Sequence, residues 1–265
     1  MSDESWKVMT FNLRRRKPSD GSNTWRRRRD AVVEVVRRQA PDILGTQEGL
    51  EDQVEYIAEN FPEYHVVGQG RFGGALDEHN ALFYRADRFR LLDSDTFWLS
   101  DTPEVAGSRS WGNLVPRMAT WARLRDKDTG REIHHVNTHL DHLVPSARRR
   151  GAQLINDHLP ADDNTVAILS GDFNALQRGG TYRYLTGSKG AALLDSRYAC
   201  TTPVATRWNA TYHHFRGRGL YRIDYILGRG VASFDDYAVV RDQIDGQWPS
   251  DHFPVVSRVH PRAAA

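Results

Sequence analysis

Residues 165–175 read Thr-Val-Ala-Ile-Leu-Ser-Gly-Asp-Phe-Asn-Ala, an apolar run of strand length that stops at an acid and an amide. The four apolar residues predict a strand buried on both faces, and Gly171 lets the backbone turn where Asp172 and Asn174 emerge. A carboxylate oxygen is a ligand that Mg²⁺ prefers, and an amide can hydrogen-bond a phosphate oxygen or water without adding charge. Taken alone, the stretch fits an Asx turn after a strand equally well.

The composition bounds the class of protein. The chain has 265 residues, of which 39% are apolar and 26% charged, and no linker, repeat or low-complexity segment divides it. We therefore expect one soluble domain over residues 1–265. No run approaches the length of a membrane span, and the first residues lack the apolar stretch of a secretory signal, so a cytoplasmic protein is expected. The single cysteine, Cys200, excludes an internal disulfide and a thiolate zinc cluster.

The charge balance argues against a protein that coats nucleic acid without specificity. The formal net charge is +2, from 36 basic and 34 acidic residues. Basic runs nevertheless occur at residues 14–17, 26–29 and 148–150. The first run follows Asn12 and is a candidate to meet an anionic substrate, whereas solvated helix faces are the simpler interpretation of most of these residues.

Further predicted strands also end in polar residues. The alternating stretch 7–13 ends at Asn12, and the short apolar stretch 42–48 delivers Glu48, although an isolated Glu there also suits a helix start. Helical spacing predicts a helix over 25–39, capped within 22–24, and a second amphipathic helix after Glu48. Other strands are expected at 64–67, 81–84, 95–100, 119–124, 133–140, 221–227 and after residue 252, with a helix over 146–158.

Eight polar residues thus stand at the ends or exits of predicted strands: Asn12, Glu48, His139, Asp172, Asn174, Asp224, Asp251 and His252. Acids without cysteines indicate a hard-metal site, with Mg²⁺ as the expected ion and Mn²⁺ as the alternative. A carboxylate among the apolar neighbours of Asp224 needs a partner, because an unpaired buried charge is costly. A histidine held by a buried Asp can take a proton from water or stabilise charge at phosphorus.

Six motifs carry a resemblance to a known family: Phe11-Asn12, Thr46-Gln-Glu48, Asn137-Thr-His-Leu140, Gly171-Asp-Phe-Asn174, Ile223-Asp-Tyr-Ile226 and Ser250-Asp-His252. In order and approximate spacing, the chain resembles the endonuclease/exonuclease/phosphatase superfamily with the DNase I-like fold, over nearly its whole length. The resemblance implies an α/β fold, a four-layered α/β sandwich of two mixed, mostly antiparallel β-sheets flanked by helices. The site would lie at the top of that sandwich.

The same resemblance implies a metal site. Glu48 would ligate the divalent ion, with Asn12 beside it and Asp251 contributing. Some nuclease relatives carry an acid two residues after the Asn, whereas this chain has Arg14. The arginine disfavours a second metal there and makes Arg14 a candidate for substrate binding.

Catalytic roles follow from the resemblance as well. Asp172 would orient the nucleophilic water and Asn174 would hold the scissile phosphate. His252, kept in place by Asp224, would act as general base or electrostatic stabiliser, so Asp172 and His252 share the base assignment.

A second catalytic pair is also implied. His139 resembles the second histidine of the DNase I branch, and Glu78 lies where that branch has an acid bonded to it. The alternative for His139 is a strand-end histidine with ordinary hydrogen bonds. The alternative for Asp224 is a structural ion pair with Arg222 or Arg117.

Four further residues complete the candidate set. Arg117 offers a guanidinium that matches phosphate oxygens in two prongs, with surface charge as the alternative. His213, His214 and Trp111 are candidates to line the pocket, Trp111 by stacking a ring, but ordinary packing or a solvated loop is the preferred interpretation for these three.

Taken together, these residues predict a Mg²⁺-dependent hydrolase of a small phosphomonoester or phosphodiester, such as a nucleotide, sugar phosphate or inositol phosphate. An RNA or DNA nuclease, deadenylase-like or DNase I-like, is the alternative, with the arginine runs following the backbone. A catalytically silent binding module is disfavoured by the intact set of acids and histidines. Neither a membrane nor an obligate protein partner is implied, and a monomer is expected.

Overall fold

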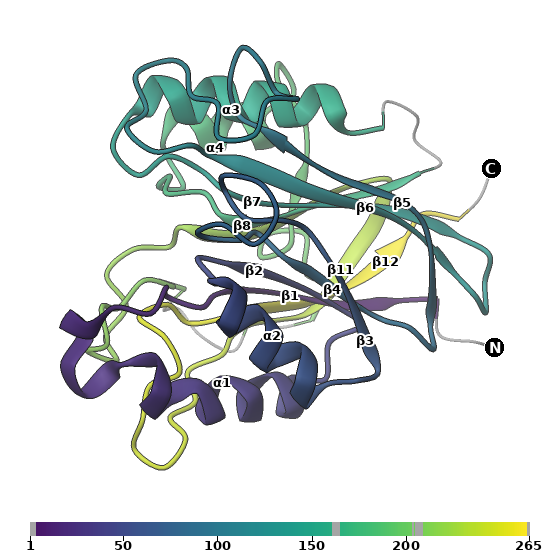
Figure 1. Cartoon of the computed structure of the whole chain (residues 1–265). Coiled ribbons are helices and arrows are strands. Elements are labelled where there is room, and N and C mark those ends of the chain that lie inside the picture. Colours follow the sequence, from purple (N-terminus) through teal and green to yellow (C-terminus); the bar gives the residue numbers. More distant parts are fainter. Residues whose placement is uncertain (1–3, 161–164, 203, 205–208, 264–265) are drawn as a thin grey trace.

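Two six-stranded sheets stacked face to face form the centre of the molecule. The computed structural model describes residues 4–160, 165–202, 204 and 209–263. Figure 1 shows helices α3 and α4 over the outer face of one sheet and α1 and α2 over the outer face of the other. The expected four-layered α/β sandwich is therefore confirmed. Within the described ranges, no helix combines the length and the hydropathy that crossing a membrane requires.

The first sheet has the strand order β11-β12-β1-β2-β4-β3. Its strands are β1 (Trp6–Asn12), β2 (Ile43–Gln47), β3 (Tyr64–Val67), β4 (Leu82–Arg85), β11 (Val231–Val239) and β12 (Val255–Pro261). Strands β1 and β2 are parallel, and the other neighbours are antiparallel. A short 3₁₀ helix, η1 (Pro18–Asn23), leads into α1 (Trp25–Gln39), and α2 (Glu51–Asn60) follows β2.

The second sheet has the order β5-β6-β7-β8-β10-β9. Its strands are β5 (Phe89–Trp98), β6 (Met118–Asp126), β7 (Glu132–His139), β8 (Val166–Asp172), β9 (Leu194–Asp195) and β10 (Asp224–Arg229). Here β7 and β8 are the parallel pair. Helix α3 (Pro145–His158) connects these two strands, and α4 (Gly180–Thr186) follows β8.

Alternation along the central strands divides their side chains between two cores. In β8, Val166 and Ile168 belong to the core between the sheets, whereas Ala167 and Leu169 belong to the core beneath α3. Successive side chains of a strand point to opposite faces, and both faces of this strand are covered. The continuous apolar run predicted from the sequence is thus a strand buried on both sides.

Toward one end of the strands, the surface between the sheets becomes polar. Gln47 Nε2 donates to Asn137 Oδ1 at 2.7 Å and to Thr10 Oγ1 at 3.0 Å. Asn137 Nδ2 donates in turn to the backbone oxygen of Thr46 at 2.8 Å. A Cβ atom on Gly45 would lie 2.7 Å from Asn137 Oδ1, so only glycine leaves room for this bridge. These buried hydrogen bonds join the two sheets and fix their relative register.

Several elements depart from the sequence-based expectations. Strand β5 begins at Phe89 and not at residue 95, and the strand expected over 221–227 begins at Asp224. Strand β11 has register shifts along its pairing with β12, which break the two-residue alternation that would have predicted it. Thr24 occupies the N-cap position of α1, but its side chain makes no capping hydrogen bond.

Gly171 serves a different purpose from the expected turn. It lies inside β8 opposite Thr138 of β7, with φ of 141°. A Cβ atom at this position would lie 1.9 Å from the backbone oxygen of Thr138. Glycine is therefore required by the close approach of the two parallel strands.

We predict that Gly171→Ala lowers the free energy of unfolding by about 3 kcal/mol or more, because the methyl group forces β7 and β8 apart next to the polar strand ends. Gly74→Ala is the matched control, since Gly74 also has positive φ, 53°, but an added Cβ meets nothing within 4 Å. Urea unfolding followed by circular dichroism measures both. A loss in Gly171→Ala no larger than that in Gly74→Ala would show that the close approach to Thr138 does not require the glycine.

Candidate functional site

The predicted site residues lie where strand ends of both sheets meet. His139 at the end of β7 pairs with Asp172 at the end of β8, and Asp172 pairs with Asp224 at the start of β10. Because β10 runs antiparallel to β8, its first residue reaches the same edge at which β8 ends. Asn12 ends β1 in the first sheet, and His252 lies shortly before β12. The eight strand-end residues predicted from the sequence are thus brought to one edge of the sandwich.

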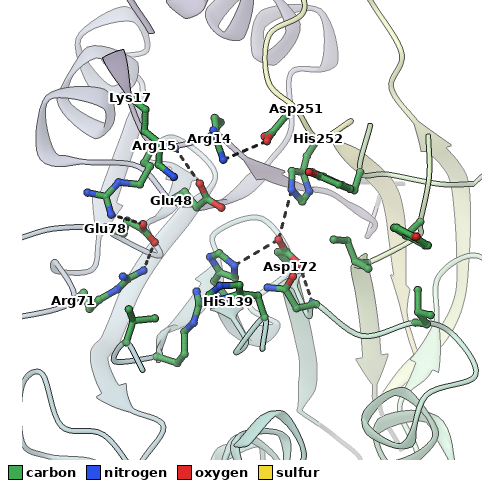
Figure 2. Close-up of a pocket in the computed structure, with 18 residues that line it drawn as sticks. Arg14, Arg15, Lys17, Glu48, Arg71, Glu78, His139, Asp172, Asp251 and His252 are labelled. Carbon is green, nitrogen blue, oxygen red and sulfur yellow. Dashed lines mark hydrogen bonds and ion pairs between the residues drawn. The ribbon is translucent and has the colours of Figure 1, made fainter. Parts of the chain in front are cut away.

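A cleft of about 730 Å³ opens at this edge. Nine of the predicted residues line it: Arg14, Glu48, Glu78, Arg117, His139, Asp172, Asn174, Asp251 and His252. Asn12 and Asp224 are buried and contact lining residues from behind, at 0% and 1% exposure. Figure 2 shows the acids and histidines converging on the cleft, with Arg15, Lys17, Arg71 and Glu78 grouped on the side away from His252.

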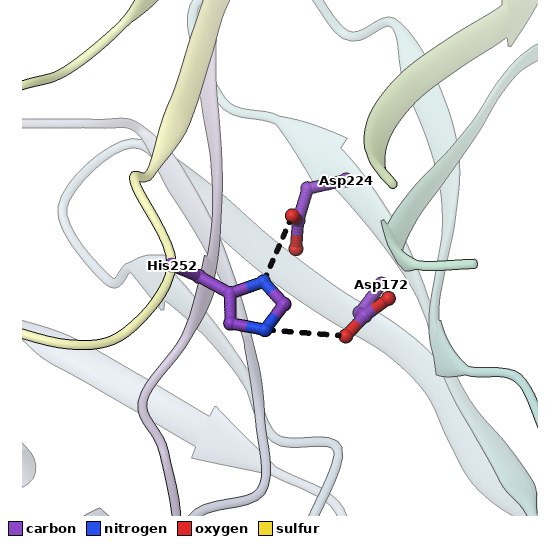
Figure 3. A group of neighbouring side chains, drawn as sticks. All are labelled: Asp172, Asp224 and His252. Atoms are coloured by element: carbon purple, nitrogen blue, oxygen red, sulfur yellow. Dashed lines mark hydrogen bonds and ion pairs between the residues drawn. The ribbon is translucent and has the colours of Figure 1, made fainter. Parts of the chain in front are cut away.

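His252 and Asp224 form a buried pair. Nδ1 of His252 lies 2.9 Å from Oδ2 of Asp224, and its Nε2 lies 3.8 Å from Oδ2 of Asp172 (Figure 3). Burial by itself would lower the pKa of His252, but the carboxylates of Asp224 and Asp172 outweigh burial and raise this pKa to about 10. The imidazole ring is therefore protonated at neutral pH in the metal-free protein. Arg222, the alternative partner of Asp224, pairs instead with Asp195 at 2.6 Å.

Asp172 lies at the centre of the site. Its Oδ2 accepts a hydrogen bond from Asn12 Nδ2 at 3.0 Å, and its Oδ1 accepts one from the backbone N–H of Asn174 at 2.9 Å. Burial and the charge of Asp224 raise the pKa of Asp172 to about 7. Asn174 has φ of 47°, which Asn tolerates better than most residues, and its Nδ2 donates to the backbone oxygen of Leu140.

Glu48 is held by the first sheet and by the segment after β1. Its Oε1 accepts from Asn12 Nδ2 at 3.1 Å and its Oε2 from the backbone N–H of Arg15 at 3.1 Å. Burial would raise the pKa of Glu48, but the charge on His252 and the hydrogen bond from Asn12 outweigh it and lower this pKa. Glu48 has φ of 62°, a strained conformation for this residue type, of the kind found at functional sites.

The donor set fits a divalent cation. Burial raises the pKa of Asp251, and the nearby charge of Glu48 adds to this rise. Oδ1 of Asp224 has no hydrogen-bond partner among the described residues. Buried carboxylates that repel one another and lack full compensation are stabilised by a bound cation. Glu48 with Asp251 is one place for such an ion; Asp172, Asp224 and His252, with ligand atoms within 4.8 Å of one another, are a second.

Arginines form the cationic part of the cleft. Arg117 is 5% exposed, and its Nη2 lies 2.8 Å from Nδ1 of His142. Its Nε and Nη1 have no partner among the described residues, and burial lowers its pKa. The surface-charge alternative for Arg117 is therefore wrong. Arg14 pairs with Asp20 at 3.0 Å and lies 3.5 Å from Asp251, so it also reaches the cleft.

The expected hydrogen bond between Glu78 and His139 is not present in the described structure. Oε1 of Glu78 accepts from Arg15 Nη1 at 2.8 Å, and its Oε2 accepts from Arg71. His139 has its Nε2 3.6 Å from Asp172, while its Nδ1 has no partner among the described residues. Burial, together with the charge of Arg117, lowers the pKa of His139, so the ring is neutral. Glu78 therefore pairs with two arginines and not with His139, the partner that the family resemblance implied.

Two predicted substrate-binding residues lie outside the cleft. His213 is fully buried and its ring stacks on Phe253 with the centroids 3.8 Å apart; burial lowers its pKa to about 3. Trp111 donates from Nε1 to Asp101 at 2.8 Å and packs against the core beneath α3. Both residues therefore follow the packing alternative, because neither is among the residues that line the cleft.

Arg15 and Lys17, from the basic run at residues 14–17, also line the cleft. Seven further lining residues were not singled out from the sequence: Arg71, Val115, His142, Leu176, Tyr212, Tyr221 and Ile223. Some of these had a usable signal. Leu176 follows Asn174 by two residues, and Ile223 directly precedes Asp224. Side chains so close to predicted site residues are candidates for contact with the same ligand.

The family model for endonuclease/exonuclease/phosphatase proteins matches residues 9–252. The chain belongs to this family. The family includes phosphatases and nucleases, which hydrolyse phosphate esters and generally depend on a divalent metal. The six motifs through which the sequence resembles this family lie within or directly beside the matched residues.

Similar proteins place the chain within this family. An endonuclease/exonuclease/phosphatase family protein from Bacteroides thetaiotaomicron is 34% identical, over 96% of this chain and 94% of that one, with a TM-score of 0.89. A mannosyl-6-phosphatase from the same organism is 35% identical, over 96% and 99%, with a TM-score of 0.87. Nocturnin from Drosophila melanogaster is 27% identical, over 57% of this chain and 24% of the length of Nocturnin. This chain covers less than two thirds of the length of each curated relative that it matches.

We predict that Asp172→Asn stabilises the metal-free protein at pH 8. The pKa of Asp172 is raised above its unfolded value, so the ionised carboxylate costs stability that grows from about pH 4 and is complete above pH 7. Differential scanning calorimetry in EDTA should show a Tm that is higher by about 2–4 °C. This shift corresponds to a gain of about 1 kcal/mol in the free energy of unfolding for a domain of this size.

At pH 5, where the native carboxyl is largely protonated, the same substitution should change the Tm little. Asp157→Asn, an exposed change on α3, is the control and should leave the Tm unchanged at both pH values. A lower Tm for Asp172→Asn at pH 8 would contradict the raised pKa.

Proposed function

We propose that this protein is a Mg²⁺-dependent phosphatase that hydrolyses a small phosphomonoester, most specifically a sugar phosphate. The observation that carries the proposal is the His252–Asp224 pair beside Asp172 in a cleft that five basic side chains line. The similarity to a mannosyl-6-phosphatase, which extends over almost the full length of both chains, supports the choice of substrate class. A volume of about 730 Å³ is of the size that small ligands occupy.

In the proposed reaction, Asp172 orients the attacking water and accepts its proton as the new O–P bond forms. The pKa of Asp172, raised to about 7, suits a general base near neutral pH. His252, held by Asp224, is protonated and stabilises the charge that develops on the departing ester oxygen. This assignment divides the two roles that the sequence left shared between Asp172 and His252.

Binding of the phosphoryl group falls to groups at fixed positions around these two residues. Arg117 lines the cleft, and its guanidinium places a positive charge beside the position proposed for the phosphate. Asn174 is fixed by its hydrogen bond to Leu140 and faces the cleft beside Asp172. Glu48 with Asp251, and with Asn12 in support, would hold Mg²⁺, which would supply positive charge to the phosphate oxygens.

A nuclease is the second candidate, and one observation favours it. A groove of about 440 Å³ next to the cleft is lined by Arg16, Lys17, Arg26 and Arg29, and Lys17 lines the cleft as well. A basic groove that continues from the site is suited to the phosphates of a nucleic-acid strand. The substrate panel described next separates the two candidates.

We predict turnover of small sugar phosphates in the presence of Mg²⁺ or Mn²⁺, because the cleft accommodates a phosphate with one small substituent. Release of inorganic phosphate should be measured with hexose phosphates, inositol phosphates and nucleotides, and fragment release with single-stranded and duplex oligonucleotides. His252→Ala should lower kcat on the best substrate by about 10²-fold or more, and EDTA should abolish activity. Cleavage of oligonucleotides alone would replace the phosphatase assignment by the nuclease, and no turnover of any ester would favour a binding module.

We predict that Glu48→Gln raises the Mg²⁺ concentration for half-maximal activity by about 10-fold or more, because it removes a charged ligand. Asp224→Asn should instead lower kcat with an unchanged Mg²⁺ requirement. Glu55→Gln, an exposed change on α2, is the control and should alter neither quantity. A shifted Mg²⁺ requirement in Asp224→Asn, and not in Glu48→Gln, would place the ion at the Asp172, Asp224 and His252 cluster.

A further inference from the structure

We propose that Leu176, Tyr212, Tyr221 and Ile223, which we call the apolar wall, form the subsite for the ring of a cyclic sugar phosphate. The inference rests on the proposed phosphatase function and specifies which part of the substrate this side of the cleft recognises. All four residues line the cleft. None of them belongs to the acids, histidines and arginines discussed above.

The apolar wall exposes surface that a folded protein normally covers. Tyr221 and Leu176 are each 53% exposed although they line a concave site. Ligand pockets are typically lined by apolar and aromatic side chains with a few polar groups among them. An exposed tyrosine and leucine inside such a pocket therefore present contact area for a ligand.

Backbone hydrogen bonds fix the chain segments that carry these side chains. Tyr221 forms a β-bridge with Tyr212, and its backbone oxygen accepts the N–H groups of Tyr212 at 3.0 Å and Thr211 at 2.8 Å. The backbone oxygen of Leu176 accepts the N–H of Gly179 at 2.7 Å, and that of Ile223 accepts the N–H of Phe173 at 2.8 Å. The backbone of the apolar wall therefore needs no ordering when a ligand binds.

The apolar wall adjoins the catalytic residues. The ring of Tyr212 packs against that of His252 with the centroids 5.0 Å apart, and Ile223 directly precedes Asp224. The charged residues Arg15, Lys17, Arg71 and Glu78 lie on the side of the cleft away from His252 (Figure 2). The cleft thus has two unlike sides, an apolar one beside the His252–Asp224 pair and a charged one remote from it.

This arrangement selects a substrate with an anionic end and a rigid apolar face. A pyranose ring presents C–H groups on one face and hydroxyl groups at its edge, so that its face can pack on Tyr221 while its hydroxyl groups reach solvent or charged residues. An acyclic polyol phosphate carries the same phosphate but has no fixed face to pack. The apolar wall should therefore discriminate between cyclic and acyclic phosphates and not between phosphates and other anions.

The test compares one cyclic and one acyclic substrate. Activity on mannose 6-phosphate and on glycerol 3-phosphate is measured for the wild-type protein and for Tyr221→Ala, Tyr221→Phe and Leu220→Ala. Leu220 is the matched control, because it is the neighbouring apolar residue, 52% exposed, and does not line the cleft. Circular dichroism and the Tm of each variant report whether its fold is intact.

We expect Tyr221→Ala to lower kcat/KM on mannose 6-phosphate by about 10-fold, chiefly through KM, because a lost apolar contact of this size costs that factor. Glycerol 3-phosphate should change less than about 2-fold in the same variant. Tyr221→Phe should retain activity on the hexose phosphate, since the ring face remains, and Leu220→Ala should match the wild-type protein.

Equal losses on both substrates, or no loss on either, would overturn the assignment of the apolar wall while leaving the phosphatase proposal standing. If no ester is hydrolysed, the phosphatase proposal fails, and titration calorimetry with mannose 6-phosphate decides the apolar wall separately. Binding weakened about 10-fold by Tyr221→Ala would support it, and equal binding would refute it.

Discussion

Hydrogen bonds that cross between the two sheets are the constraint on which this site depends. Asn12 of the first sheet donates from one amide nitrogen to Glu48 and to Asp172 of the second sheet, at 3.1 and 3.0 Å. His252, from the first sheet's side, meets Asp224 of the second at 2.9 Å. Neither sheet alone carries all of the acids, amides and histidines that meet at the cleft. The proposed chemistry therefore requires that the two sheets keep their relative position, which the buried hydrogen bond between Gln47 and Asn137 helps to hold.

The site concentrates features that oppose stability. Asp172 and Asp251 are buried carboxylates whose pKa values are raised, and Glu48 adopts a strained backbone conformation at the end of a strand. Arginines offset part of this cost, and a divalent cation would offset more. Such conflicts are typical of functional sites, because groups placed to stabilise a reacting phosphate are not placed to stabilise the empty protein.

The sequence was most informative where a side chain's position follows from its own strand. Alternation places Val166, Ile168 and Asp172 on the same face of β8, so the buried run and its polar end could be predicted together. It was least informative about residues that reach the site from loops. Arg71 lies between β3 and β4, and its contact with Glu78 depends on the fold of that loop. Stacking of His213 on Phe253 likewise had no local signal.

By itself, the sequence predicted the eight strand-end residues, because apolar periodicity is a local property of the chain. Its short motifs carried the family resemblance, and that resemblance implied the four-layered architecture. Only the tertiary structure decided which of these groups touch. In that structure Asp224 forms a hydrogen bond with His252, and Glu78 forms ion pairs with Arg15 and Arg71. Tyr221 lines the cleft. The physical reason is that hydrogen bonds and ion pairs form between atoms a few ångströms apart in space, and that proximity arises from the packing of two sheets whose strands are distant in the chain.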